Sequence, residues 1–155
     1  INRSLIRNGN TSMFVTFFAG VLNLNTRRLR FCNAGHPYPI IIKLDGTVEM
    51  FKTADNLPLG VSSDYEYEEQ ECYFASGSQL LLYSDGVTEA QNEDAKFYKI
   101  DRLFQFVEEN KNLSSKELVE KIIAHVDAYA GKAEQSDDLT VMSLRYEKQK
   151  GVRWL

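Results

Sequence analysis

The sequence predicts an α+β protein in which helices cover an antiparallel β-sheet or sandwich. Three observations support this fold class: strand-like segments come first, two segments with helical spacing follow, and one more strand-like segment comes after them. Because the strands precede the helices instead of alternating with them, we expect mostly antiparallel pairing. The early strand-like segments are residues 13–24, 28–33, 38–44, 48–52, 65–74 and 79–84.

The first elements follow from composition and periodicity. Residues 1–9 are typical of the end of a helix, with Gly9 as its C-terminal cap. Residues 13–24 predict a strand, and their nearly continuous apolarity predicts burial on both faces. Residues 28–33 alternate and predict the hairpin partner of that strand. Three aromatic residues of the first strand are expected in the core: Phe14, Phe17 and Phe18.

The middle of the chain reads as hairpins and loops. Asp45-Gly46 is a turn signal between the segments 38–44 and 48–52. Residues 53–64 carry Asn, Pro, Gly and Ser and predict a loop. Residues 65–74 mix acidic and aromatic side chains, which suits a half-exposed strand, whereas 79–84 predict a buried one.

Two helices and a strand are expected in the last part. Apolar residues recur at helical spacing between Phe97 and Val107. A second helix begins with a capping box, Ser114 with Glu117, and ends near Gly131. Residues 139–146 predict the final strand. We therefore expect a domain over residues 1–146 and a tail over 147–155.

Composition excludes several classes of protein. The 155 residues carry a net charge of -4 at a sequence pI near 5.3, which argues against non-specific nucleic-acid binding. No stretch approaches the roughly 18 apolar residues of a membrane span. Cys32 and Cys72 are expected as buried free thiols, and with two histidines they do not give zinc spacing. A reducing, cytoplasmic setting follows as the expectation.

Two acidic motifs stand at strand ends. Asp85 follows the buried strand QLLLYS, and Gly86 beside it permits close backbone approach. Asp137 and Asp138 precede the last strand. If these strands lie antiparallel side by side, Asp85 and Asp137 converge, and carboxylate oxygens favour a hard ion, Mg²⁺ or Mn²⁺. The alternative is that Asp85-Gly86 is a turn and that Asp137 or Asp138 caps another.

The histidines have milder interpretations. His36 lies in Asn33-Ala34-Gly35-His36-Pro37, where it is either a structural donor in a turn, a phosphate ligand or a general acid. His125 follows Ile122 on the apolar stripe of the last helix, where packing is expected.

The order of these motifs resembles one known family. NAGHP, LPLG, SDGVTEA and SDDLTV follow one another with the spacing typical of the bacterial PPM-type serine/threonine phosphatases of the stage II sporulation protein E family. The resemblance covers almost all of residues 1–146. It implies an αββα-layered β-sandwich that carries two Mn²⁺ or Mg²⁺ ions at one end.

The resemblance also assigns roles to residues. Asp85 and Asp137 match metal ligands of the family, while Gly86, Asp138 and His36 are expected as accessory residues around them. No side chain is expected as a nucleophile, because in this family a metal-bound water attacks the phosphorus atom of phosphoserine or phosphothreonine. Metals suit this chemistry because they lower the pKa of water and neutralise phosphoryl oxygens.

The family implies partners as well. Its usual substrate is a phosphorylated anti-sigma-factor antagonist of the STAS fold, and related members act behind an upstream sensor domain. The chain would then be cytoplasmic, or the cytoplasmic portion of a larger, membrane-anchored sensor. The alternative is a pseudophosphatase or regulatory interaction module of the same fold. No nucleic-acid partner is expected.

Two departures from the family pattern have consequences. The family carries a further Asp ligand and a Gly-His-Gly stretch that would precede Ile1, so we expect an N-terminally truncated domain with part of the metal site. The chain alone is then expected to be inactive, with an open sheet edge suited to a homodimer. In addition, Lys99 stands where the family usually has Gly, which makes the geometry of that loop an open question.

Overall fold

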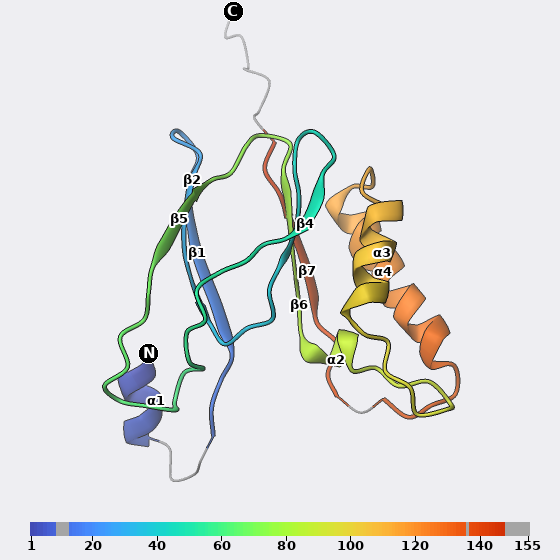
Figure 1. Cartoon of the computed structure of the whole chain (residues 1–155), viewed down its shortest axis with the longest axis horizontal. Coiled ribbons are helices and arrows are strands. Elements are labelled where there is room, and N and C mark those ends of the chain that lie inside the picture. Colours follow the sequence, from blue (N-terminus) through green and yellow to red (C-terminus); the bar gives the residue numbers. More distant parts are fainter. Residues whose placement is uncertain (9–12, 136, 148–155) are drawn as a thin grey trace, which may run out of the picture. The chain divides into compact units, whose positions relative to one another are not determined.

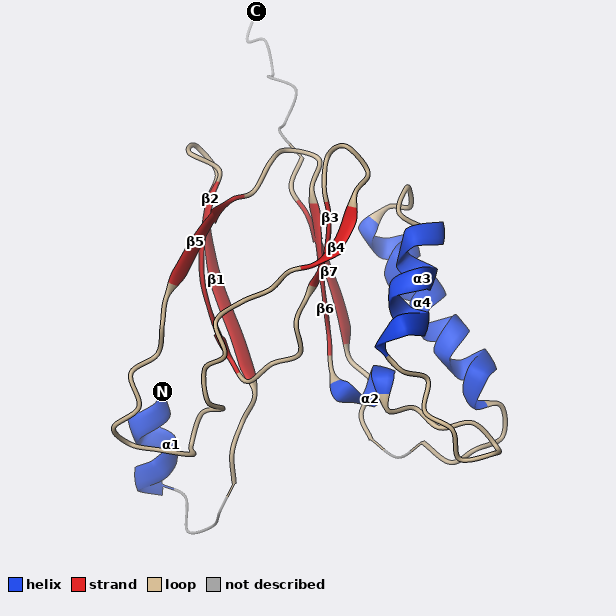
Figure 2. Cartoon of the chain, viewed as in Figure 1, coloured by secondary structure: helices blue, strands red, loops and turns tan. Residues whose placement is uncertain are grey.

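The computed structural model describes residues 1–8, 13–135 and 137–147, and it divides into two compact units (Figures 1 and 2). The first unit comprises Ile1–Tyr38 and Lys52–Phe74, and the second comprises Pro39–Phe51 and the chain from Ala75 onward. The expected cap at Gly9 and all of the expected tail except Glu147 lie outside the described residues. In the described part, no helix combines the length and the apolarity needed to cross a bilayer.

The first unit is built on a small antiparallel sheet. The sheet has three strands in the order β1-β2-β5. The predicted hairpin is confirmed: Phe17 lies opposite Ala34, and the Asn23 side chain accepts hydrogen bonds from the N–H groups of Asn25 and Thr26 in the turn. The elements of this unit are α1 (Asn2–Asn8), β1 (Phe17–Asn23), β2 (Arg28–Ala34) and β5 (Gln70–Tyr73).

The predicted burial of residues 13–24 is wrong. Phe14 is 62% exposed and Phe17 is 39% exposed, while Phe18 is half-buried. The physical reason is position, because β1 is an edge strand and β2 is the central one. Accordingly the buried residues of this sheet all lie on β2: Leu29, Phe31, Asn33 and Ala34. The aromatic run reflects strand propensity more than burial.

The cysteines also differ from the expectation. Both are free, as predicted, but both are half-buried instead of fully buried. Cys32 lies on β2 and Cys72 on β5, where Cys72 faces Leu29 across the ladder. Partial burial raises the pKa of each thiol, which keeps both in the neutral form at neutral pH.

The predicted strand over 65–74 is shorter in the structure, where only Gln70–Tyr73 pair. Loop side chains take the place of a ladder before Gln70. Asn56 Oδ1 accepts from the Glu68 N–H at 2.9 Å, and Tyr67 donates to the Pro58 carbonyl at 3.2 Å. The bond to Asn56 satisfies the Glu68 N–H, a backbone group that a longer strand would have paired.

The second unit contains a four-stranded antiparallel sheet in the order β4-β3-β6-β7. The Asp45-Gly46 turn is confirmed: Gly46 has a φ of 82°, and Asp45 Oδ1 accepts from the Thr47 N–H at 2.9 Å. Its strands are β3 (Ile40–Ile42), β4 (Val48–Met50), β6 (Gln79–Tyr83) and β7 (Val141–Arg145). Its helices are α2 (Asp85–Thr88), α3 (Ile100–Glu109) and α4 (Ser115–Ala130).

One hydrophobic core joins the sheet of this unit to its helices, and Figure 1 shows α3 and α4 together on one side of the sheet. The capping box is confirmed, because Ser114 Oγ accepts from the Glu117 N–H and the Glu117 carboxylate accepts from the Ser114 N–H. The buried residues of this core are Ile40, Ile42, Val48, Leu81, Tyr83, Val87, Tyr98, Leu103, Val107, Leu118, Ile122 and Val126.

His125 has the packing role predicted for it. Its ring stacks on Phe106 with centroids 4.3 Å apart, and its Nδ1 lies 2.6 Å from the hydroxyl of Tyr98. Tyr98 is fully buried, and burial raises the pKa of its phenol to about 12. The phenol therefore stays protonated and links α4 to the segment before α3.

Lys99 occupies a backbone conformation suited to glycine. Its φ of 69° and ψ of 157° lie in a region that is essentially open only to glycine. The Lys99 N–H donates to the Thr88 carbonyl at 2.8 Å, which holds the residue there. The loop thus has a backbone geometry typical of glycine although a lysine occupies the position.

We expect Lys99→Gly to raise the free energy of unfolding by about 1 kcal/mol. Relief of roughly 1–3 kcal/mol of backbone strain is partly offset by the larger unfolded-state entropy of glycine. Chemical denaturation monitored by circular dichroism measures the change. Lys99→Ala is the matched control, because it removes the same side chain but keeps a Cβ, and an equal gain in that variant would contradict the strain argument.

Candidate metal centre

The two acidic motifs lie at one end of the second sheet. β6 and β7 are antiparallel neighbours, with Tyr83 opposite Val141. The end of β6 therefore meets the start of β7, as the sequence predicted. Asp85 comes two residues after Tyr83, and Asp137 and Asp138 come shortly before Val141. The topology brings both motifs to the same edge.

Ser84 fastens the two segments together. Its N–H donates to the Thr140 carbonyl at 3.0 Å. Its hydroxyl donates to the Asp138 carbonyl at 3.0 Å and accepts from the Thr140 N–H at 3.0 Å. Residues 138–140 are thus held alongside the start of α2 by a single side chain and its backbone. Sequence reasoning quoted Ser84 only as part of a motif and missed this role.

Gly86 explains why the segments approach so closely. It is buried, and a Cβ placed on it would lie 2.4 Å from the carbonyl oxygen of Asp138. Real Cβ atoms essentially never approach an oxygen so closely, so only glycine fits. Asp85-Gly86 is also the first turn of α2 and no free-standing turn, which the sequence did not predict.

The two aspartates present their carboxylates at the surface of this edge. Both residues are exposed. Asp85 Oδ1 accepts from the Gly86 N–H at 3.0 Å, and Asp137 Oδ1 accepts from the Asp138 N–H at 2.7 Å. These contacts fix each carboxylate against its own backbone. Ionised carboxylates supply only acceptors, which suits a hard divalent cation.

The donor set for such a cation is incomplete in the described residues. There, no three acidic, histidine or cysteine side chains gather closely enough to hold a metal ion. Among the described residues the two aspartates do not form a complete cage, and their role as two of the ligands stays a prediction. Mg²⁺ and Mn²⁺ sites typically use several oxygens, with water among them. Asp138, predicted as an accessory acid, contributes its backbone carbonyl to Ser84.

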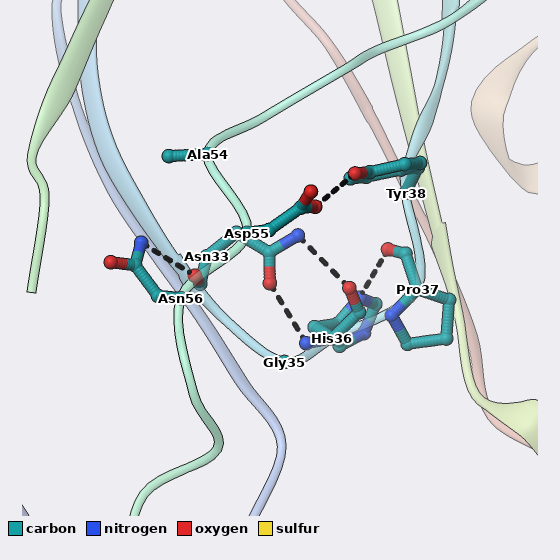
Figure 3. A pocket seen from close by; sticks show the side chains of 8 residues that line it. All are labelled: Asn33, Gly35, His36, Pro37, Tyr38, Ala54, Asp55 and Asn56. Carbon is teal, nitrogen blue, oxygen red and sulfur yellow. Dashed lines mark hydrogen bonds between the residues drawn. The ribbon is translucent and has the colours of Figure 1, made fainter.

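His36 lies in a pocket of the first unit, shown in Figure 3. Asn33, which is 3% exposed, holds the turn: its Oδ1 accepts from the His36 N–H at 2.8 Å and its Nδ2 donates to the His36 carbonyl at 2.9 Å. The His36 ring adds a 2.8 Å contact between Nδ1 and the Pro37 carbonyl. Gly35 has a φ of 73°, and a Cβ there would lie 2.6 Å from Pro58.

A second buried amide completes this arrangement. Asn56 donates to the Asn33 carbonyl at 3.0 Å, and Asp55 beside it is hydrogen-bonded to the hydroxyl of Tyr38 (Figure 3). The pocket among these residues has a volume of about 350 Å³. The contacts agree with a structural role for the motif, whereas an accessory role of His36 at the metal stays a prediction. Asn33 and Asn56, which carry the turn, were not singled out from the sequence.

We expect His36→Ala to lower the free energy of unfolding by about 1 kcal/mol, the usual net contribution of one hydrogen bond. Asn33→Ala should cost more, about 2–3 kcal/mol, because it leaves buried groups without partners. Urea denaturation of both variants measures the difference. Should His36→Ala abolish activity and leave the denaturation midpoint unchanged, the structural interpretation of His36 would be wrong.

The chain is similar in sequence to one known protein family. The sequence model of the family described as Stage II sporulation protein E (SpoIIE) matches residues 1–147. Phosphoserine phosphatase RsbU of Bacillus subtilis (strain 168) is 30% identical over 122 residues, which make up 79% of this chain and 36% of RsbU. The chain therefore spans little more than a third of that relative.

Solved structures show the same fold. The SiaA-PP2C domain of Pseudomonas aeruginosa has a TM-score of 0.74 at 21% identity, covering 94% of this chain and 57% of that domain. The Mn-presoaked phosphatase domain of SpoIIE from Bacillus subtilis has a TM-score of 0.72 at 20% identity, covering 97% of this chain and 64% of that one. The predicted PPM-type α+β fold is therefore confirmed.

Proposed function

The chain belongs to the stage II sporulation protein E family, and from this we infer that it is part of a metal-dependent protein serine/threonine phosphatase. One observation carries the proposal: Ser84 and Gly86 hold the two acidic motifs together at the edge formed by β6 and β7. The name of RsbU, a phosphoserine phosphatase, supports the same class of reaction.

Asp85 and Asp137 would hold Mn²⁺ or Mg²⁺ in this enzyme. The bound ion supplies a lowered pKa for water and neutralises charge on the phosphoryl oxygens. The chain itself contributes the two carboxylates and a backbone that fixes their spacing. Hydrolysis forms one P–O bond from water and breaks the ester P–O bond, which yields inorganic phosphate and a free serine or threonine hydroxyl.

We also propose a substrate protein and a cellular setting for this phosphatase. A phosphorylated STAS-domain anti-sigma-factor antagonist fits the family resemblance and the phosphoserine activity named for RsbU. We propose further that the chain works in the cytoplasm behind an upstream sensor domain. The mildly acidic composition agrees with a protein substrate and not with nucleic acid.

The test separates an enzyme from a pseudophosphatase. Phosphate release from a phosphoserine protein is measured with the full-length gene product in the presence and absence of Mn²⁺. Metal-dependent release supports the proposal, and no release at any metal concentration supports a regulatory module. For the 155-residue chain alone, we expect Mn²⁺ binding in the millimolar range by isothermal titration, because two carboxylates compensate poorly for dehydration of the ion.

A homodimer through β1 is the partner proposal that the fold favours. β1 is an edge strand, Val21 on it is 73% exposed, and no charged residue interrupts residues 13–26. Natural edge strands are usually protected by charge or proline, which this edge lacks. We expect analytical ultracentrifugation to show a concentration-dependent dimer of the 155-residue chain that Val21→Lys disrupts. A monomer at all concentrations would contradict this pairing.

A further inference from the structure

A second pocket lies directly beside the candidate metal centre. Figure 1 shows α2, the end of α4 and the loop that leads into β7 at the same end of the second unit. The pocket among them has a volume of about 210 Å³, and both Gly86 and Asp137 contribute to its wall. The pocket therefore borders the segments that Ser84 fastens together.

The pocket is lined by both apolar and acidic residues. Apolar side chains form one part of it, among them Val126, Ala130 and Leu139. Besides Asp137, two carboxylates, Asp127 and Glu134, form another part. Among the described residues that line the pocket there is no lysine, arginine or histidine, and within the described chain neither Asp127 nor Glu134 takes part in an ion pair.

A pocket with apolar surface and carboxylates favours some chemical groups as ligands over others. A phosphate group is disfavoured, because like charges at close range repel. A divalent ion held by Asp127 and Glu134 is also disfavoured, because these two carboxylates belong to no group of three or more possible ligands among the described residues. A lysine or arginine side chain suits both kinds of lining, since its methylene stem can cover apolar surface while its charged head pairs with a carboxylate.

We propose that this pocket is a specificity subsite that binds a lysine or arginine side chain of the substrate protein near its phosphorylated residue. The proposal rests on the phosphatase function proposed above. The position of the pocket supplies the geometric reason, because its wall includes Asp137 of the metal centre. A substrate lysine or arginine bound there brings the phosphorylated residue close to the carboxylates of the proposed metal centre. Its positive charge offsets the repulsion between these carboxylates and the phosphate before metal binds.

The experiment compares two series of phosphoserine peptides in the full-length gene product with Mn²⁺. In one series a single lysine moves through the positions flanking the phosphoserine, and in the other series glutamine replaces it. We expect one lysine position to lower KM about fivefold relative to its glutamine partner, the scale of an exposed ion pair. Asp127→Asn combined with Glu134→Gln should abolish that preference. Hydrolysis of para-nitrophenyl phosphate, which has no peptide, should stay unchanged.

Glu120→Gln is the control for a general loss of negative charge, because Glu120 lies on α4 but does not line the pocket. A lysine preference that survives in the double variant, or equal KM values for both series in the unchanged protein, would overturn the proposal. Absence of hydrolysis on every substrate would instead contradict the proposed function. In that case fluorescence anisotropy of labelled peptides tests whether the pocket binds lysine. Equal affinity for the lysine and glutamine peptides would contradict the proposal.

Discussion

Asp85→Asn and Asp137→Asn should each reduce Mn²⁺-dependent phosphate release by at least about 100-fold in the full-length gene product. Each change replaces a charged oxygen ligand with a neutral amide of nearly the same shape. A hard divalent ion loses both a ligand and the charge that offsets its dehydration. The chemistry depends on that ion, so turnover falls with its occupancy.

Stability measurements separate this effect from misfolding. Both aspartates are exposed, and their main-chain contacts are acceptors that an asparagine side-chain oxygen can replace. We therefore expect the free energy of unfolding to change by less than about 1 kcal/mol. Asp64→Asn, an exposed aspartate in a loop of the first unit, is the control and should retain full activity. Full activity of either site variant would remove that aspartate from the metal centre.

Several elements of the second unit were predictable because their signals are local. Asp45-Gly46 specifies a tight turn, QLLLY specifies a buried strand, and the capping box at Ser114 fixes the start of a helix. Such signals depend on a few neighbouring residues, so they survive in any tertiary context. The convergence of the two acidic motifs then followed from antiparallel pairing of β6 with β7.

The burial of β1 was not predictable in the same way. Its composition matches a buried strand, and only its place at the edge of the sheet leaves Phe17 and Val21 exposed. Whether a strand lies at the edge or in the centre depends on the whole sheet, and the hydrophobic periodicity of the strand's own sequence does not reveal it. The role of Ser84 was hidden for a similar reason, since its partners lie 54 and 56 residues away in sequence.

Lys99 shows a third case, in which the sequence left the loop geometry open and the structure shows a strained backbone. The family's glycine indicates a position that needs positive φ, and the structure holds Lys99 at a φ of 69°. The hydrogen bond from Lys99 to Thr88 ties this strained residue to the end of α2, the helix that begins at Asp85. Strain of this kind is often found near functional sites. Lys99 is hydrogen-bonded to Thr88, which lies three residues after Asp85, and this position agrees with the proposed centre.

Gly86→Ala should destabilise the protein by about 2–4 kcal/mol and remove Mn²⁺-dependent activity with it. The added methyl group would meet the Asp138 carbonyl oxygen at 2.4 Å, and neither atom belongs to a flexible side chain that could move aside. The added methyl group either strains this contact or pushes the two segments apart. Separation of the segments weakens the hydrogen bond from Ser84 Oγ to the Asp138 carbonyl. Because the same contact holds the segments of Asp85 and Asp137 side by side, we expect the two proposed metal ligands to move apart as well.

Gly20→Ala is the matched control for this substitution. Gly20 also has no positive φ, but a Cβ there would meet a side-chain methyl of Leu29 at 3.2 Å, and that methyl can shift. We expect its effect on unfolding to stay below about 1 kcal/mol. Urea denaturation of both variants gives the comparison. Equal stabilities for the two would mean that the approach of Gly86 to Asp138 is not maintained in solution, and the close approach of the two acidic segments would then need another cause.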